Sequence, residues 1–521
     1  MSGKLIKSTS VVGSMTLLSR ISGLIRDVVL ANILGDRAAA DVFFVAFRIP
    51  NFFRRMTAEG AFAAAFVPVF TDFRENHDRD QGKRFLELTL GRFGLVLALF
   101  SLAGVAAAPW LVKAIAWGFS ENPAKFALTV EATRITFPYL FFISLVAMAG
   151  AMLNSCGRFA GPAATPILLN VCLILAAWQL VDVMDSGPLA LAVGVLVAGV
   201  VQLLFQVPFL RREALLVKPR LRRTPGDRVA ADGAGQVFRL MLPAIFGVSV
   251  AQLNVLINTL LASFLVTGSI SWLYYSDRLM EFPVGVFGIA LGTVILPGLS
   301  RQHAAESPGR FSRTLDWGMR WVFLICVPAT AALIILAVPL ISTIFYHGDF
   351  TRNGVGMSAL SLVAYSFGLV PIVLVKVLAP GYFARKDTRT PVRIGIIAVA
   401  VNIVASLALF TTFHHVGLAA ATSIAAVVNA GLLYSGLRRS GVLHLEPEWP
   451  SLLVRVIGAS AVMGLLLYMG MGDSGWWLDS PVPERVSRLG WLVPAGLVTY
   501  FIVLVVSGVP LKFLLSGRGT E

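Results

Sequence analysis

Long apolar runs recur along the whole chain, and they constrain its fold more than any other feature. Each run is about 18–25 residues long, which matches the hydrocarbon thickness of a bilayer and predicts a transmembrane helix. The 521 residues are 57% hydrophobic and only 14% charged, a balance that no soluble globular protein of this size needs. The sequence therefore predicts an all-α integral membrane protein that crosses the bilayer many times.

We expect about fourteen spans, so the predicted fold is built almost entirely within the membrane. They lie near residues 12–34, 40–70, 86–110, 130–154, 162–182, 188–208, 238–266, 270–298, 318–345, 356–381, 391–411, 416–436, 453–471 and 489–509. The largest polar connection, 211–236, is too short and too basic to be a folded domain. A small apolar N-terminal segment is expected to be a retained first helix, because Arg20 and Arg26 interrupt it and no small-residue cleavage site follows.

Three pairs of similar features, each about 230 residues apart, indicate an internal repeat. The pairs are Arg48 followed by Val67-Pro68 and Arg278 followed by Leu296-Pro297, Pro138 and Pro371, and Leu210-Arg211-Arg212 and Leu437-Arg438-Arg439. Because six spans is an even number, the two halves should be parallel lobes. We expect an N-lobe at 1–212, a basic cytoplasmic linker at 213–237, a C-lobe at 238–439 and two additional spans within 440–521.

The distribution of charge predicts the orientation. Lys and Arg gather in alternate connections, such as 74–84, 211–239 and 301–320, whereas the opposite connections hold acidic residues such as Asp182 and Asp473. Cytoplasmic connections carry the excess of Lys and Arg, so both termini should be cytoplasmic. This placement also explains the net charge of +15 without a nucleic-acid partner.

Cysteine and histidine give no sign of a metal or redox site. Cys156, Cys172 and Cys326 lie in or beside apolar runs and form no disulfide framework, and the histidines are scattered without metal-ligand spacing. We expect no cofactor and no metal.

Charged residues inside the predicted spans are the candidate functional residues. An arginine at the bilayer centre costs about 2.5–3.5 kcal/mol on insertion scales, so it is kept where it faces water or a partner. In the second span Arg55 and Glu59 are one helical turn apart and can pair. Arg54 has no acidic residue three or four positions away, and neither does Arg26 in the first span.

The intramembrane cations exceed the anions by two. The cations are Arg20, Arg26, Arg48, Arg54, Arg55, Arg278 and Lys376, and the anions are Asp27, Asp41, Glu59, Asp277 and Glu281. Such a surplus indicates a wet cavity or one that receives an anion, and the fork of arginine suits phosphate. The alternative is that these side chains are structural or reach to the interface, which fits Arg48 and Lys376 better than Arg26 or Arg54.

Four long motifs resemble the MurJ family of lipid II flippases, also called MviN. They are SRISGLIRDVVLANILG, DVFFVAFRIPNFFRRMTAEGAFAAAFVPVF, SWLYYSDRLMEFPVGVFGIALGTVILP and VLAPGYFARKDTRTPV. The resemblance covers essentially the whole chain. It implies the fold of the multidrug/oligosaccharidyl-lipid/polysaccharide exporter superfamily, with two six-helix lobes around a central cavity and a groove for the lipid tail at the last two spans.

The resemblance also implies a function and a set of site residues. The substrate would be lipid II, the undecaprenyl-diphosphate-linked peptidoglycan precursor, moved to the outer leaflet of the bacterial inner membrane for cell-wall synthesis. Membrane lipids, and other cell-wall synthesis proteins, are candidate partners. The family's cavity residues fall on Ser19, Arg20, Arg26, Asp27, Asp41, Asn51, Arg54, Glu59 and Arg278, and Arg48 stands where some relatives have lysine. A sodium site described for some members needs an acidic residue in span seven, and none lies between Leu240 and Val266.

Two other classes of protein remain to be weighed. An exporter of another lipid-linked glycan or of a drug would share the fold and the repeat, although a drug exporter should have fewer arginines in its cavity. A membrane transferase would place clustered acidic residues in a polar loop, whereas these loops are short and basic. We therefore expect a transporter and not an enzyme.

Overall fold

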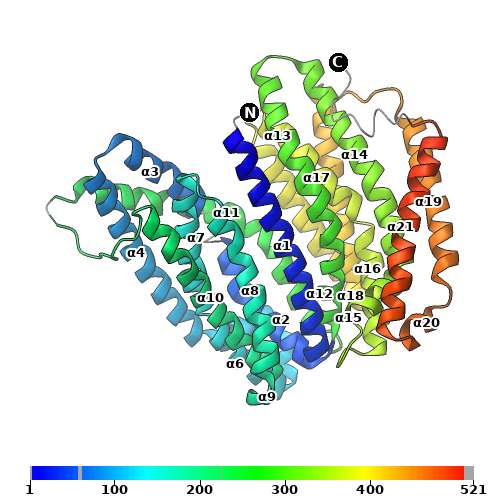
Figure 1. Cartoon of the computed structure of the whole chain (residues 1–521), viewed down its shortest axis with the longest axis horizontal. Helices are drawn as coiled ribbons and strands as arrows, with labels where there is room; N and C mark the ends of the chain where they lie inside the picture. The colour runs from blue at the N-terminus through cyan, green and yellow to red at the C-terminus, as the bar shows by residue number, and fades with distance from the viewer. Residues whose placement is uncertain (1–2, 57–61, 225, 510–521) are drawn as a thin grey trace. The chain divides into compact units, whose positions relative to one another are not determined.

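The computed structural model describes residues 3–56, 62–224 and 226–509, and every regular element in these ranges is helical (Figure 1). The chain divides into two compact units, residues 1–268 and 269–521. The first unit contains α1 (Gly3–Leu34), α2 (Ala38–Arg54), α3 (Ala63–Asn76), α4 (Arg79–Ala106), α5 (Ala108–Ile115), η2 (Trp117–Glu121), α6 (Pro123–Thr136), α7 (Tyr139–Ser155), α8 (Ala160–Gln179), α9 (Val181–Met184), α10 (Gly187–Arg212) and α11 (Arg228–Ser263).

The second unit has a similar series of helices followed by two more. It contains α12 (Ser269–Pro283), the π-helical turn η3 (Val284–Gly288), α13 (Ile289–Ala304), α14 (Pro308–Ile335), α15 (Ala337–Phe345), α16 (Arg352–Ser366), α17 (Leu369–Phe383), α18 (Arg389–Arg439), α19 (Trp449–Met471), α20 (Ser474–Asp479) and α21 (Val482–Val506). Figure 1 shows α19 and α21 side by side at one edge of this unit, with α19 packed against α14.

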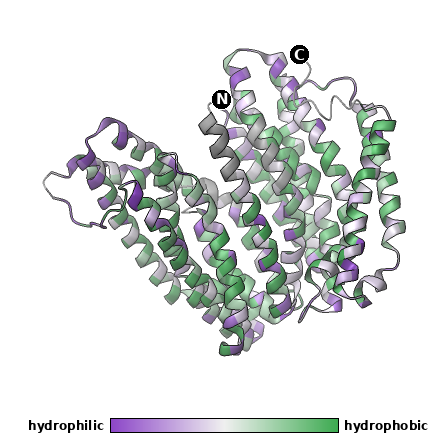
Figure 2. Ribbon diagram, viewed as in Figure 1, coloured by the Kyte–Doolittle hydropathy of each residue, from purple (hydrophilic) through white to green (hydrophobic). Residues whose placement is uncertain are grey.

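The helices form because apolar runs are bounded by polar capping residues and by proline. The side chains of Asp78, Asn122 and Thr351 accept backbone N–H bonds at the starts of α4, α6 and α16. Figure 2 shows hydrophobic residues along the helices and hydrophilic residues gathered at connections such as α3–α4 and α13–α14. This distribution is the one expected for helices whose sides face lipid and whose ends face water.

Helix boundaries repeat with a nearly constant offset. α4 begins at Arg79 and α14 at Pro308, 229 residues later, and both are 28 residues long. The short helices α5 and α15 begin at 108 and 337, and α6 and α16 begin at 123 and 352, again 229 residues apart. The internal repeat predicted from the sequence is therefore present in the secondary structure.

The count of fourteen spans is not confirmed. Within the described residues, nine helical segments are long and apolar enough to cross a membrane. One of them, α18, covers two predicted spans, and a kink at His414, which has a non-helical conformation (φ 51°, ψ −132°), divides it into two helices between those spans. Conversely, predicted span eight is divided among α12, η3 and α13, where the π-helical turn interrupts the α-helical hydrogen bonds.

Helix α11 lies in the first unit, where it packs on α3, α4, α5 and η2. By sequence offset its counterpart is α1, which packs mainly on α8. The predicted C-lobe, 238–439, includes most of this helix, whereas the first compact unit, 1–268, contains all of it. The lobe boundaries therefore stay a prediction.

An apolar cluster and a polar cluster attach the last two spans, α19 and α21, to the rest of the second unit. Leu324, Val456, Leu467, Trp477 and Tyr500 belong to the apolar cluster, which joins α14, α19, α20 and α21. In the polar cluster, the Arg320 guanidinium on α14 contacts the carboxylates of Asp316 (2.8 Å) and Glu448 (2.9 Å). The indole N–H of Trp449, the first residue of α19, donates to Asp316. These contacts fix the start of α19 against α14.

Candidate functional site

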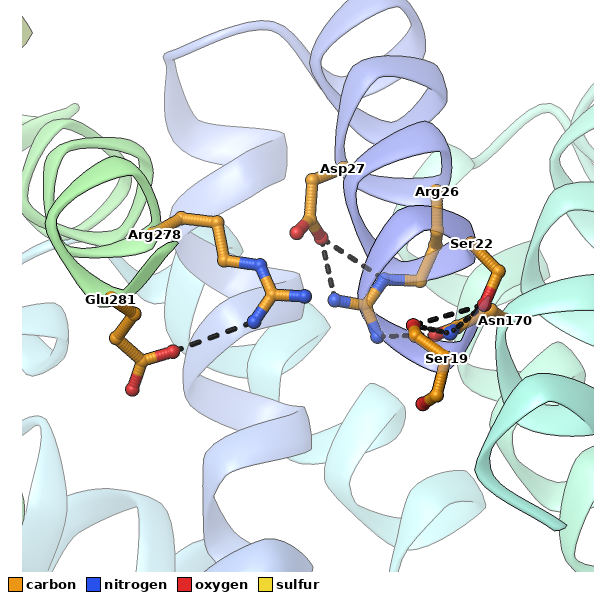
Figure 3. A network of polar contacts seen from close by, with 7 residues as sticks. All are labelled: Ser19, Ser22, Arg26, Asp27, Asn170, Arg278 and Glu281. Carbon is orange, nitrogen blue, oxygen red and sulfur yellow. Dashed lines mark hydrogen bonds and ion pairs between the residues drawn. The ribbon is translucent and has the colours of Figure 1, made fainter. Parts of the chain in front are cut away.

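One face of α1 carries a group of hydrogen-bonded polar residues (Figure 3). Ser19, Ser22 and Arg26 are spaced by three and four residues, so a helix places them on one face. The Arg26 guanidinium donates through Nη2 (2.6 Å) and Nε (3.0 Å) to Oδ1 of Asp27, and through Nη1 (3.0 Å) to Oδ1 of Asn170 on α8. Arg26 is only 8% exposed and Asp27 is fully buried.

The pairing of Arg26 with Asp27 corrects one expectation. No acidic residue lies three or four positions from Arg26 in the sequence, so no acidic partner was expected for it. The structure shows that its side chain folds back onto the carboxylate of the next residue. Burial favours this geometry, because a guanidinium in a low-dielectric environment gains more from a close carboxylate than an exposed one does.

Asn170 was not among the residues predicted for the site. Its Nδ2 donates to Oγ of Ser22 (2.8 Å) and to the carbonyl of Ser19 (3.2 Å), so one amide joins three residues of α1 to α8. The available signal was a polar residue midway along an apolar 20-residue helix. The neighbouring Arg20 is half-buried on α1.

The cations of α2 contact neutral oxygen atoms. Arg54 Nε donates to Oδ1 of Asn51 (3.0 Å), one turn earlier on the same helix. Arg48 Nη1 donates to the hydroxyl of Thr259 on α11, and Arg55 Nη1 donates to Oε1 of Gln252 (3.3 Å) on the same helix. The expected pairing of Arg55 with Glu59 cannot be compared, because Glu59 lies outside the described residues.

Asp41 lies at the opposite end of α2 from Arg54. Thirteen residues separate them, and at 1.5 Å per residue this corresponds to about 20 Å along the helix. The buried Asp41 carboxylate accepts from Lys125 Nζ (2.9 Å) and from the backbone N–H of Gly268 (2.8 Å). Lys125 also lies 4.0 Å from the ring centroid of Phe119. The residues predicted for one site therefore occupy two separate places in the first unit.

In the second unit Arg278 lies on α12, six residues before Val284, where the π-helical turn begins. Its Nη1 is 3.4 Å from Oε2 of Glu281, so the two residues form the ion pair that their spacing indicates (Figure 3). Both side chains are partly exposed. A partly exposed cation on α12 can contact a solute.

The donor groups suit an anion better than a metal ion. Among the residues that the structure describes, no three His, Cys, Asp or Glu side chains group in a way that could hold a metal. Guanidinium groups on α1, α2 and α12 supply planar pairs of N–H donors, which match the oxygen atoms of phosphate.

Comparison with known proteins assigns the family. The family model described as lipid II flippase MurJ matches residues 30–477. The chain belongs to the MurJ family.

MurJ relatives align along nearly the whole chain. The chain is 45% identical to the probable lipid II flippase MurJ of Vibrio cholerae, over 98% of both sequences. It is 38% identical to the lipid II flippase MurJ of Burkholderia cenocepacia, over 97% of this chain and 98% of the relative.

Solved structures show the same fold. A lipid II flippase MurJ in an inward closed conformation matches with a TM-score of 0.79 and 23% identity, over 95% of this chain and 98% of the other. An inward-facing multidrug resistance MATE family transporter of the MOP superfamily matches with a TM-score of 0.66 and 14% identity, over 83% of this chain and 98% of the other. The MurJ chain therefore has the superfamily fold expected from its motifs.

Proposed function

We propose that this protein is a flippase that moves lipid II, the undecaprenyl-diphosphate-linked peptidoglycan precursor, from the inner to the outer leaflet of the bacterial cytoplasmic membrane. The observation that carries the proposal is the 38–45% identity to lipid II flippases over nearly the full length of the chain. The intramembrane arginines agree with it, because the substrate carries a diphosphate.

In this proposal Arg26, Arg54 and Arg278 bind the diphosphate. They come from three different helices, and each guanidinium can bond two phosphate oxygens at once. A charge-assisted hydrogen bond contributes about 1.5–3 kcal/mol, with the lower end expected in a wet cavity. Ser19, Arg20, Asn51 and Glu59 are proposed to line the same cavity. Arg48 supplies a further positive charge.

Asp41 has a different proposed role. It is buried and bonded to Lys125 and Gly268, about 20 Å along α2 from Arg54, so we place it at the outer end of the transport path. There it holds the turn before α12 against α2. Asp27 is proposed to hold Arg26 and not to contact the substrate directly.

Transport is proposed to proceed by alternating access, with the two lobes rocking about the central cavity. The repeat of helix boundaries supports this mechanism, because matched lobes can exchange inner and outer openings. Both termini are proposed to be cytoplasmic, and the groove beside α19 and α21 is proposed to receive the lipid tail.

The test is substitution of the proposed diphosphate ligands. Arg26→Ala and Arg54→Ala should each weaken binding of purified lipid-linked precursor by about tenfold or more and should fail to complement a depleted strain. Protein level is measured in parallel. If both variants accumulate, bind precursor and complement like the parent, these arginines do not bind the diphosphate.

The alternative is an exporter of a drug or of another lipid-linked glycan. The likeness to the MATE transporter, at 14% identity, concerns the fold alone. Depletion of the protein in its native cell distinguishes the substrates, because accumulation of lipid II on the inner leaflet is expected only for the flippase.

A further inference from the structure

Asn170 has the bonding pattern of a residue that orients an arginine. It lies midway along α8, is 4% exposed, and uses its oxygen and its nitrogen on different partners of α1. The oxygen accepts from Arg26, and the nitrogen donates to Ser22 and to the Ser19 carbonyl (Figure 3).

The chemistry of the partners fixes the orientation of this amide. A guanidinium can only donate, so the amide oxygen must face Arg26, and a backbone carbonyl can only accept, so the amide nitrogen must face Ser19. Reversing the amide would lose both bonds. Ser22 strengthens the arrangement, because its hydroxyl accepts from Asn170 and donates to the Ser19 carbonyl (3.0 Å).

Asn170 is neutral, whereas Asp27, which also bonds Arg26, carries a negative charge. Asp27 holds one edge of the guanidinium with a carboxylate, which offsets the positive charge. Asn170 holds Nη1 with an amide oxygen, which fixes the plane of the group and leaves its charge unchanged. The same solution recurs on α2, where the amide oxygen of Asn51 accepts from Arg54.

We propose that Asn170 is a positioning residue for anion binding, which holds the Arg26 guanidinium in the plane that receives the substrate diphosphate. This inference rests on the proposed function. It assigns Asn170 no direct contact with the substrate, so its effect should pass entirely through Arg26.

The chain offers a matched control in the second unit. Asn402 is also a fully buried asparagine within a membrane helix, α18, but its amide bonds the hydroxyls of Thr422 and Ser406 (both 3.4 Å) and not a cation. A purely structural role for Asn170 would make Asn170→Ala and Asn402→Ala alike. Both should lower thermal stability, and only Asn170→Ala should change the affinity for an anion.

The experiment measures binding of lipid II to the full-length protein in nanodiscs. Asn170→Ala should weaken binding by roughly three- to tenfold, the range expected when one interhelical hydrogen bond is lost. Asn170→Asp keeps an acceptor for Arg26 but adds a second carboxylate that competes with the diphosphate. Asn170→Asp should therefore weaken binding at least as much as Asn170→Ala, and it provides the measurement if Asn170→Ala fails to accumulate. Asn402→Ala should bind like the parent.

A double-mutant cycle decides whether Asn170 acts through Arg26. Added to Arg26→Ala, the Asn170→Ala change should cause no further loss of affinity. The inference is overturned if the two losses multiply, or if both Asn170 variants bind like the parent while Arg26→Ala is weakened. If Arg26→Ala itself binds like the parent, Arg26 does not bind the diphosphate, and the proposed role of Asn170 is then also wrong.

Discussion

At the scale of single residues, three intramembrane arginines of the first unit each donate to a neutral oxygen atom. Arg26 is bonded by Asn170, Arg48 by Thr259 and Arg54 by Asn51. Amide and hydroxyl oxygens satisfy N–H donors without cancelling the positive charge, so the group remains attractive to an anion. A site made only of ion pairs would be neutral and would bind phosphate less well.

The shape of the cation should matter more at Arg54 than at Arg48. Arg54→Lys keeps the charge but loses the planar fork that bonds two phosphate oxygens, so we expect poor complementation. Arg48→Lys should be tolerated, because a lysine ammonium can also donate to the Thr259 hydroxyl. Complementation of a depleted strain, with precursor binding measured in parallel, checks both. Equal behaviour of the two lysine variants would contradict the distinction.

The buried pair of Asp41 and Lys125 should be a strong local determinant of stability. Lys125→Met leaves a buried carboxylate without its cation and should lower the free energy of unfolding by about 3–5 kcal/mol, the range for breaking a buried ion pair. The double change Asp41→Leu with Lys125→Met removes both charges and should recover much of the loss. Thermal unfolding in detergent measures this. A double variant no more stable than Lys125→Met would show that the pair is not the cause.

The sequence predicted which residues are charged inside the membrane but not what they contact. Arg26 and Asn170 are 144 residues apart, and Arg48 and Thr259 are 211 apart, so no helical spacing connects them. Short-range rules identified the Arg278–Glu281 pair and missed Arg26–Asp27, because adjacent residues usually point to different sides of a helix.

At the scale of elements, breaks inside helices were the hardest feature to predict. An apolar run shows that the chain crosses the membrane, but it does not show where the helix bends. Thus η3 interrupts the span that contains Arg278, whereas the break at His414 in α18 falls between two predicted spans, 391–411 and 416–436. Proline marks some breaks, such as that before α7. The π-helical turn at 284–288 also follows a proline, but a proline in the sequence does not by itself predict a π-helical turn.

The basic linker is an element that docks on α4, and Asp227 and Arg220 supply contacts for this docking. The Asp227 carboxylate accepts from the hydroxyl and the backbone N–H (2.8 Å) of Thr224 and lies near the guanidinium groups of Arg220 and Arg84. The backbone N–H of Arg220 donates to the Glu87 carbonyl on α4 (2.9 Å). The two Thr224 bonds, assisted by these cations, lower the pKa of Asp227.

This linker should therefore loosen in acid. A carboxyl with a depressed folded-state pKa stabilises the docked form above the unfolded value of about 3.9, and the stabilisation is lost as the pH falls through the folded-state pKa. Asp227→Asn should remove this stabilisation of the docked linker at neutral pH.

Protection factors for hydrogen exchange at the Thr224 and Arg220 amides measure docking. They should fall in Asp227→Asn at pH 7, and the parent should approach the variant in acid. Asp232→Asn, at an exposed position on α11, is the control. Equal protection at pH 7 in the parent and in Asp227→Asn would exclude this role.

At the scale of the whole molecule, the internal repeat was predictable because proline and arginine positions recur in order. The structure adds that short helices recur as well, at α5 and α15. What the sequence could not place is α11, which follows the linker yet packs on α3 and α4. Helix packing depends on which apolar faces meet, and a helix that is apolar around most of its surface does not specify its neighbour.

The orientation of the molecule is tested by labelling. In a background with the three native cysteines replaced by serine, Asp182→Cys and Asp473→Cys should react with an impermeant thiol reagent added to intact cells. Arg222→Cys should react only after the cells are opened, because excess Lys and Arg keep its connection cytoplasmic. All three positions are exposed, so differences in burial do not confound the result. Labelling of Arg222→Cys in intact cells would contradict the predicted orientation, because this connection would then face the outside.

Alternating access makes a further prediction at the outer end of α2. The bond from the Gly268 N–H to Asp41 ties α2 to the turn that leads into α12. With the predicted boundaries Asp41 lies in the N-lobe and Gly268 in the C-lobe, so rocking of these lobes would have to break the bond in every cycle, whereas motion between the two compact units would leave it intact. The exposed residues Ala38 and Thr267 flank this bond. Ala38 is one helical turn from Asp41, and Thr267 is one residue from Gly268.

In the cysteine-free background, Ala38→Cys with Thr267→Cys, joined by a short reducible thiol crosslinker, should stop transport of lipid II into the outer leaflet. Reduction should restore it, and each single-cysteine variant should remain active after the same treatment. Full transport with the crosslink complete would mean that the outer end of α2 does not separate from this turn, and rocking of lobes that divide at the predicted boundaries, 1–212 and 238–439, would be excluded as the mechanism.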